Sequence, residues 1–221
     1  MLDGLLIINK PSGWTSFDVV AKIRNKLGVK KVGHTGTLDP MATGVLVLCL
    51  GKATKLAQEI TGTDKEYTGE VTLGATSTTD DAEGKISQIK NYKLKITNSK
   101  EIQNVLKQFQ GTIQQVPPIF SAKKIKGQRA YKLARKGEKV ELKPVEITIH
   151  ELELLDYKWP VIHVRVLCSK GTYIRSLARD IGKELGVGGY LSKLERTKVG
   201  KYTIDQSVSI EEADKKQIIP V

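Results

Sequence analysis

The sequence predicts a mixed α+β fold, because strand-like apolar runs and amphipathic helices occur along the same chain of 221 residues. Short apolar or alternating runs are typical of strands, and they occur at 5–9, 45–50, 65–74, 145–155, 161–168 and 191–199. Apolar residues at helical spacing predict helices, and these occur at 16–27, 53–60, 98–109 and 171–185. A hydrophobic content of 39% is ordinary for a globular protein with a substantial core.

The first strand, at 5–9, ends in the turn sequence Lys-Pro-Ser-Gly. Ser16 then has the character of an N-cap, and the helix that follows stops at Gly28. After the strand at 45–50 and a short helix at 53–60, the run 65–74 alternates as a half-buried strand does.

The segment 76–84 is polar and rich in turn residues, which predicts a loop. Asp80 and Asp81 lie side by side in it, and we expect a solvated turn rather than a metal site. A helix at 98–109 ends before Gly111, and two strands meet at Trp159-Pro160.

Gly171 introduces the clearest helix. Its buried stripe comprises Ile174, Leu177, Ala178, Ile181 and Leu185. Arg175 and Arg179 lie one turn apart and off this stripe. A last core strand at 191–199 precedes a segment in which we expect a short helix near Ile210.

The charge balance predicts a polyanionic partner. Lysine and arginine number 36 against 24 acidic residues, which gives a net charge of +12, and such a balance suits RNA or DNA. The segment 123–137 is especially basic and contains one tyrosine, a pattern that suits phosphate contacts. Cys49 and Cys168 each lie in an apolar run, which indicates buried free thiols in a reducing cytoplasm. No zinc spacing, signal peptide or membrane-spanning run is recognisable.

One loop concentrates unusual residues around a single acid, Asp39. The stretch 33–48 reads GHTGTLDPMATGVLVL. Its glycines permit turns that other residues forbid, and Pro40 favours an extended Asp39. A plain Asp-Pro turn is the simpler interpretation of the acid alone, but such a turn needs neither the histidine nor three glycines.

This stretch resembles the catalytic motif of the TruB-type tRNA pseudouridine synthases. The resemblance continues, in the order and spacing of the family, through NKPSGWTS at 9–16, KEY at 65–67, PPIFSA at 117–122 and SKGTYIRSLARDIG at 169–182. It covers nearly the whole chain. It implies the pseudouridine synthase fold, with a central, mostly antiparallel sheet flanked by helices and loops and an insertion that clamps RNA.

The resemblance also implies an activity and a set of site residues. The activity is isomerisation of the T-loop uridine at position 55 of tRNA to pseudouridine, by base flipping and an essential aspartate. The implied catalytic residues are Asp39, Tyr67 as the stacking residue, and Arg175 as the partner that keeps Asp39 ionised. The implied substrate-binding and RNA-binding residues are Lys10, Pro11, His34, Thr37, Tyr173, Leu194, Lys123 and Arg129. Glu195 and Arg196 follow Leu194, where the family pattern leads us to expect two basic residues.

We expect one catalytic domain over 1–221 with an insertion at about 117–143. The small C-terminal PUA domain, usual in this family, is not expected in this chain. The predicted partner is the T-stem-loop of tRNA, and no metal, cofactor or membrane is expected. We expect a cytoplasmic monomer.

Three other functions remain open at this point. The chain could be a non-catalytic module that binds or chaperones tRNA, which an activity assay would distinguish. It could be an RNA-guided pseudouridine synthase that needs partner proteins, in which case the isolated chain would be inactive on bare tRNA. An unrelated glycosidase fits less well, because no second acid is placed near Asp39 by a motif.

Overall fold

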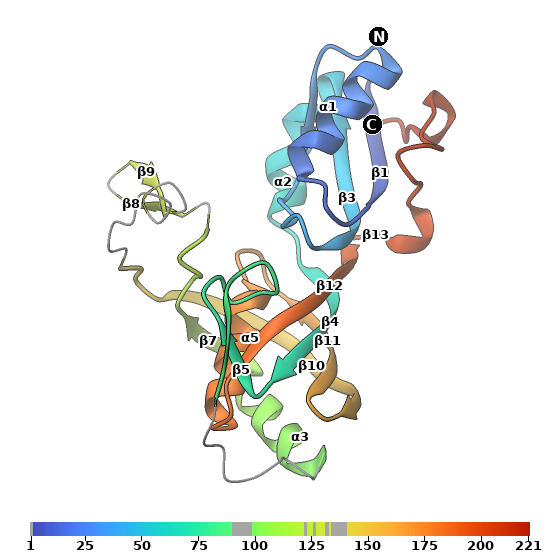
Figure 1. The fold of residues 1–221 in the computed structure, drawn as a ribbon. Coiled ribbons are helices and arrows are strands. Elements are labelled where there is room, and N and C mark those ends of the chain that lie inside the picture. Colours follow the sequence, from blue (N-terminus) through green and yellow to red (C-terminus); the bar gives the residue numbers. More distant parts are fainter. Residues whose placement is uncertain (1, 90–98, 122, 126, 131–132, 134–140) are drawn as a thin grey trace. The chain divides into compact units, whose positions relative to one another are not determined.

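The computed structural model describes residues 2–89, 99–121, 123–125, 127–130, 133 and 141–221. The chain divides into two compact units, of which the first comprises Met1–Thr68 and Leu194–Val221 and the second Gly69–Lys193. Both units contain strands and helices, so the prediction of a mixed α+β fold is confirmed (Figure 1). No helix in the described part of the chain is long and apolar enough to cross a membrane.

The first unit is built around strand β3 (Thr43–Leu50). The other elements that lie wholly within it are β1 (Gly4–Lys10), α1 (Ser16–Leu27), β2 (Val32–His34), the 3-10 helix η1 (Gly51–Leu56), α2 (Ala57–Thr61), β13 (Tyr202–Thr203), and the 3-10 helices η2 (Ile204–Gln206) and η3 (Lys215–Gln217). Strand β4 (Lys65–Leu73) begins in this unit, and strand β12 (Gly189–Val199) ends in it.

Strand β3 has a partner along each edge. It pairs antiparallel with β1 over its whole length, from Gly4 opposite Leu50 to Lys10 opposite Gly44. It pairs antiparallel with β2 near its end, and parallel with β12 near its start, where Arg196 lies opposite Gly44. The loop that contains Asp39 joins β2 to β3, so its two ends are fixed in one sheet.

The strands β1 and β3 are buried on both faces, which explains why their sequences are almost continuously apolar instead of alternating. One face packs against α1, through side chains that include Leu6, Ile8, Leu46, Leu48, Val19, Val20 and Ile23. The other face packs against η1 and α2, through Leu5, Ile7, Val45, Val47, Cys49, Ala53 and Ile60. Figure 1 shows α1 lying over β1 and β3.

The start of α1 differs from the prediction. Thr15, not Ser16, is the N-cap, and it forms a reciprocal capping box with Asp18. The Ser16 hydroxyl instead accepts a hydrogen bond from the Leu38 amide at 2.8 Å, within the Asp39 loop. The helix ends as predicted at Gly28, whose φ of 65° is in the left-handed region.

Two short helices also differ from the prediction. The segment expected to form one helix at 53–60 forms a 3-10 helix followed by α2. The helix expected near Ile210 does not form, and the two 3-10 helices η2 and η3 lie on either side of this position instead. Both cysteines are free and buried as predicted, and burial raises the pKa of the Cys49 thiol to about 11.

The second unit contains the remainder of β4 and the first part of β12. Its other elements are β5 (Ala75–Ser77), β6 (Ile86–Gln88), α3 (Ser99–Gln108), β7 (Gly111–Gln115), β8 (Lys124–Ile125), β9 (Gln128–Arg129), β10 (Val145–Lys158), β11 (Val161–Cys168) and α5 (Ile174–Glu184). The strand order is β12-β4-β11-β10-β7. The pairs β10–β11 and β10–β7 are antiparallel, as expected for this fold class.

Helix α5 buries the predicted apolar stripe, including Ile174, Leu177, Ala178 and Ile181. Arg175, which lies off this stripe, is also buried, with 6% of its surface exposed. A buried guanidinium requires polar partners, and Arg175 finds them within the second unit, in Asp81 and in the carbonyls of Thr79 and Phe120.

Candidate active site

The Asp39 loop is held by hydrogen bonds from its own backbone and from the segment before α1. The Ala42 amide donates to the Asp39 carbonyl at 3.1 Å, and the Gly13 amide donates to the Pro40 carbonyl at 2.8 Å. The buried Ser16 hydroxyl bonds both polar backbone groups of Leu38, as acceptor from its amide and donor to its carbonyl. Asp39 itself is half-buried. The loop therefore holds its carboxylate at a defined position.

Lys10 supports this loop from the end of β1. Its side chain is fully buried, and its ammonium donates to the carbonyls of Trp14 at 2.7 Å, Pro11 at 2.9 Å and Pro40 at 3.2 Å. Pro11 is exposed, and its carbonyl is one of these acceptors. The predicted pair Lys10 and Pro11 therefore lies beside the residue that follows Asp39.

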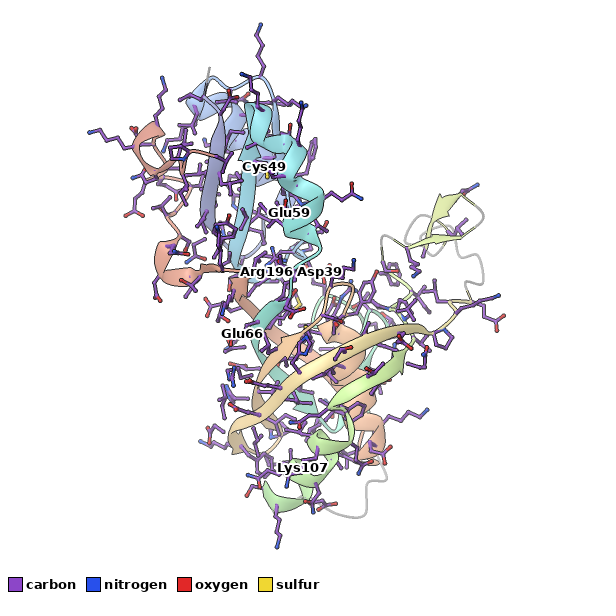
Figure 2. All side chains as sticks on the ribbon, turned by 180° about the vertical axis from the view of Figure 1, so that it is seen from behind. Asp39, Cys49, Glu59, Glu66, Lys107 and Arg196 are labelled. Atoms are coloured by element: carbon purple, nitrogen blue, oxygen red, sulfur yellow. The ribbon has the colours of Figure 1, made fainter. Side chains whose placement is uncertain are left out.

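Arg196 is a second buried cation beside the loop, and the sequence analysis did not assign it a role. Its Nε donates to the Val45 carbonyl at 2.7 Å and its Nη2 to the Gly36 carbonyl at 3.1 Å. Asp39 and Arg196 both lie near the start of β3 (Figure 2). A signal was present in the sequence, because alternation places Arg196 on the same strand face as the buried Leu194.

His34, at the end of β2, is half-buried, and its Nδ1 accepts a hydrogen bond from the Gly36 amide at 3.3 Å. In the neutral ring, this bond leaves the proton on Nε2. Burial lowers the pKa of His34, and the positive charge of Arg196 lowers it further. The histidine is therefore suited to act in its neutral form near pH 7.

Three more predicted residues lie in the same unit. Tyr67 on β4 is 9% exposed and Leu194 on β12 is 8% exposed, so both are nearly buried. Thr37, in the Asp39 loop, is exposed. The first unit thus contains seven of the eleven predicted site residues: Lys10, Pro11, His34, Thr37, Asp39, Tyr67 and Leu194.

The second unit contains Arg175 and Tyr173. The guanidinium of Arg175 donates to the carbonyls of Thr79 at 3.2 Å and Phe120 at 3.0 Å, and its Nη1 lies 3.4 Å from the Asp81 carboxylate. The backbone of Tyr173, directly before α5, exchanges two hydrogen bonds with the Gln115 side-chain amide, at 2.8 and 3.1 Å. These bonds fix the start of the helix on β7.

The prediction that Asp80 and Asp81 form a solvated turn was wrong. Asp81 is 2% exposed and pairs with Arg175. Asp80 pairs with Arg179 at 2.9 Å, and Arg179 also bonds the Val116 carbonyl at 3.0 Å. Burial raises the pKa of Asp80, more strongly than the Arg179 charge lowers it. No local pattern marks this pairing, because about a hundred residues separate the partners.

The predicted RNA-binding insertion lies mostly outside the described residues. Lys123 is exposed, and its carbonyl accepts a hydrogen bond from the Ala130 amide at 2.8 Å. Strands β8 and β9 form a hairpin that places Arg129 opposite Lys124. Within the described part of the chain, no cluster of three or more histidine, cysteine or acidic residues could hold a metal ion.

Comparison with known protein families gives two matches that together span most of the chain. Residues 24–174 match the TruB family pseudouridylate synthase N-terminal domain. Residues 175–219 match the tRNA pseudouridylate synthase B C-terminal domain.

Curated relatives resemble the chain over nearly its whole length. A tRNA pseudouridine synthase B from Parabacteroides distasonis is 53% identical over 216 residues, which cover 95% of this chain and 91% of the relative. Proteins of the same name from Thermobifida fusca and Aquifex aeolicus are 47% and 49% identical. Each match covers 96% of this chain, and the matches cover 74% and 73% of these two relatives.

Solved structures support the same fold. A chain of a Cbf5-Nop10-Gar1 complex superposes with a TM-score of 0.77 at 29% identity, over 99% of this chain and 60% of that chain. A chain of an H/ACA RNP bound to a substrate RNA containing 2'-deoxyuridine gives a TM-score of 0.71 at 29% identity, over 96% of this chain and 52% of that chain. The present chain thus spans less than two thirds of the length of these solved chains.

Proposed function

The chain belongs to the TruB family of pseudouridylate synthases, and from this premise we propose that it converts the T-loop uridine at position 55 of tRNA to pseudouridine. The observation that carries the proposal is the Asp39 loop, in which buried Lys10 and Ser16 hold the residues on either side of one half-buried carboxylate. The choice of tRNA is supported by relatives named tRNA pseudouridine synthase B at 47–53% identity.

The proposed reaction is an isomerisation. The bond between N1 of uracil and C1′ of ribose breaks, the base turns, and a new bond forms between C5 and C1′. The C5 proton leaves and N1 takes up a proton, so atoms and charge balance without any oxidation or reduction. The reaction therefore needs no redox cofactor, and no metal has a role in it.

Asp39 acts at the ribose in this proposal. It either attacks C1′ or removes a proton from the sugar, and both roles require the ionised carboxylate. An ordinary aspartate has a pKa of about 3.9 and is ionised at neutral pH. We assign to Arg175 the role that the family resemblance implies, that of the arginine whose charge keeps the catalytic carboxylate ionised. Within its own unit, the Arg175 guanidinium is held in a defined orientation by the Asp81 carboxylate and by the carbonyls of Thr79 and Phe120.

The uridine must leave its stack to reach Asp39. Flipping costs a few kcal/mol, which stacking and backbone contacts offset. We assign the stacking surface to the ring of Tyr67, and the contact beside uracil to Leu194. His34 and Thr37 hold the extruded nucleotides, and Tyr173 positions the catalytic group by hydrogen bonding. The basic segment that includes Lys123 and Arg129 contacts phosphates of the stem-loop.

Two other functions make different predictions. An RNA-guided synthase would need partner proteins. The neighbours solved in complexes, the H/ACA RNP and Cbf5-Nop10-Gar1 chains, are 29% identical to this chain, less than its tRNA pseudouridine synthase B relatives at 47–53%. A tRNA chaperone would bind without chemistry. We propose that the chain acts alone, as a monomer in the cytoplasm, where a reducing environment suits its two free cysteines.

The test is pseudouridine mapping on an unmodified tRNA transcript after incubation with the purified chain, with EDTA present and no cofactor added. We expect conversion of the T-loop uridine alone. Conversion at other uridines would refute the site assignment, and tight binding without conversion would favour the chaperone or a missing partner. A T-loop transcript with cytidine at the target position is the control for mapping artefacts.

A further inference from the structure

Arg196 connects the two ends of the Asp39 loop. Arg196 has 2% of its surface exposed, and its side chain donates hydrogen bonds to the carbonyls of Gly36, in the loop before Asp39, and Val45, in β3 after the loop. A planar guanidinium bonds two acceptors in a fixed geometry. The distance between these two carbonyls is therefore set by one rigid group.

The backbone of Arg196 constrains the same loop from the other side. Arg196 pairs with Gly44 in the parallel ladder between β12 and β3. Gly44 has a φ of +99°, and a Cβ atom there would lie 2.3 Å from the Arg196 carbonyl oxygen. The loop thus joins β3 at a point where only glycine fits against Arg196.

The charge of Arg196 is bound by backbone groups. Among the residues that the structure describes, no carboxylate forms an ion pair with Arg196 within 4.0 Å. A buried arginine is expensive unless its donors are satisfied. Two of its N–H groups donate to carbonyls that lie before and after Asp39 in the chain. The hydrogen bonds that make burial of this guanidinium possible are therefore made to the Asp39 loop and the strand that follows it.

We infer that Arg196 is a positioning residue of the reaction, which fixes the Asp39 carboxylate by holding Gly36 and Val45 at a set separation. The inference rests on the proposed function. In this proposal Arg196 acts through the conformation of the loop and not by direct contact with the substrate. A misplacement of about 1 Å at a reacting group costs on the order of 100-fold in rate.

The kinetic test compares Arg196→Met and Arg196→Lys with Val199→Ala, a buried core change on the same strand that serves as the stability control. Single-turnover rate and RNA Kd are measured well below each Tm. We expect Arg196→Met to lower the rate about 100-fold with Kd within about threefold. Arg196→Lys, which can reach only one of the two carbonyls, should recover part of the rate. The inference would be overturned if Arg196→Met lowered the single-turnover rate no more than Val199→Ala does at equal Tm. It would also be overturned if Arg196→Met weakened RNA binding and left the rate unchanged.

A second measurement does not depend on activity. Hydrogen exchange of the Ala42 amide, which bonds to the Asp39 carbonyl, reports whether the loop keeps its conformation. We expect Arg196→Lys to accelerate exchange of the Ala42 amide more than exchange of the amides in the β1–β3 ladder. Val199→Ala should accelerate exchange at the two places to the same extent. Unchanged Ala42 exchange would overturn the inference. Absence of turnover in the unmodified chain would instead refute the proposed function.

Discussion

The ammonium of Lys10 donates a hydrogen bond to the carbonyl of Pro40 at 3.2 Å, although thirty residues separate them. This bond links the end of β1 to the residue directly after Asp39. Lys10 is fully buried, and its ammonium also donates to the carbonyls of Pro11 and Trp14. These hydrogen bonds take the place of the water that would hydrate the three carbonyls in the unfolded chain.

We therefore expect Lys10→Met to lower the free energy of unfolding by about 3 kcal/mol, since buried carbonyls would lose a charged donor. Turnover should also fall, because Pro40 is no longer held. Urea denaturation and single-turnover assays measure the two effects. Lys22→Met is the matched control, since Lys22 lies on the less buried side of α1 and its loss should cost at most about 0.5 kcal/mol. Equal stability of the two variants would contradict the role of Lys10.

Asp39→Asn should abolish turnover and leave RNA affinity within about threefold. The amide has nearly the shape of the carboxylate but supplies neither a nucleophile nor a base. Rate and Kd are measured on the same tRNA transcript. Asp64→Asn, in the turn before β4, is the control for loss of one negative charge. Pseudouridine formation by the Asp39→Asn variant at a near wild-type rate would remove Asp39 from the mechanism.

His34 makes the stability of the first unit depend on pH. Burial and the charge of Arg196 lower the pKa of His34 in the folded state. As pH falls, the histidine therefore becomes protonated at a higher pH in the unfolded chain than in the folded chain. The contribution of neutral His34 to the free energy of unfolding is complete above the unfolded pKa of about 6.5. It is lost progressively as pH falls below that value towards the lower folded pKa. We expect the free energy of unfolding to fall more between pH 7.5 and pH 5.5 in the wild type than in His34→Asn. Parallel pH curves for the two proteins would show that His34 titrates alike in both states.

The strands and the Asp39 motif could be predicted because their signals are local. Apolar runs in β1 and β3 and alternation in β11 appear within a few residues. The pairing of Asp81 with Arg175 could not be predicted, because it depends on where the tertiary fold places α5. The same holds for Arg196, whose acceptors lie about 150 residues earlier in the chain.

The basic segment at 123–137 should dominate the salt dependence of tRNA binding. Replacing Lys123, Lys124 and Arg129 with glutamine should reduce the slope of log K against log salt by roughly 0.7–0.9 for each lost phosphate contact. The control removes the same charge elsewhere, with Lys107, Lys215 and Lys216 changed to glutamine. Fluorescence anisotropy over a salt series measures both. Equal slopes for the two triple variants would mean that the segment is an ordinary solvated surface.

Arg179 stabilises the turn that presents Asp81 to Arg175. Its Nη1 lies 2.9 Å from the Asp80 carboxylate, and its Nη2 bonds the Val116 carbonyl. Asp80 has a φ of 62°, which costs free energy for a residue other than glycine. The turn therefore depends on contacts such as this ion pair to keep its conformation.

We expect Arg179→Ala to lower the free energy of unfolding by about 2–3 kcal/mol at pH 7, because it leaves Asp80 as a partly buried charge. Burial already raises the pKa of Asp80, and the variant should raise it further. A carboxylate with a raised folded pKa loses stability as pH rises through the interval between its unfolded and folded pKa values. The cost of Arg179→Ala should therefore be smaller at pH 4 than at pH 7.

The double variant Arg179→Ala/Asp80→Asn tests the ion pair directly. If the cost of Arg179→Ala comes from the unpaired Asp80 charge, adding Asp80→Asn should recover part of the lost stability at pH 7 and little at pH 4. Urea denaturation of all four proteins at both pH values completes the cycle. Strict additivity of the two substitutions would show that the pair contributes nothing, and that Arg179 acts through its other partners, the Val116 carbonyl and the Asp180 carboxylate.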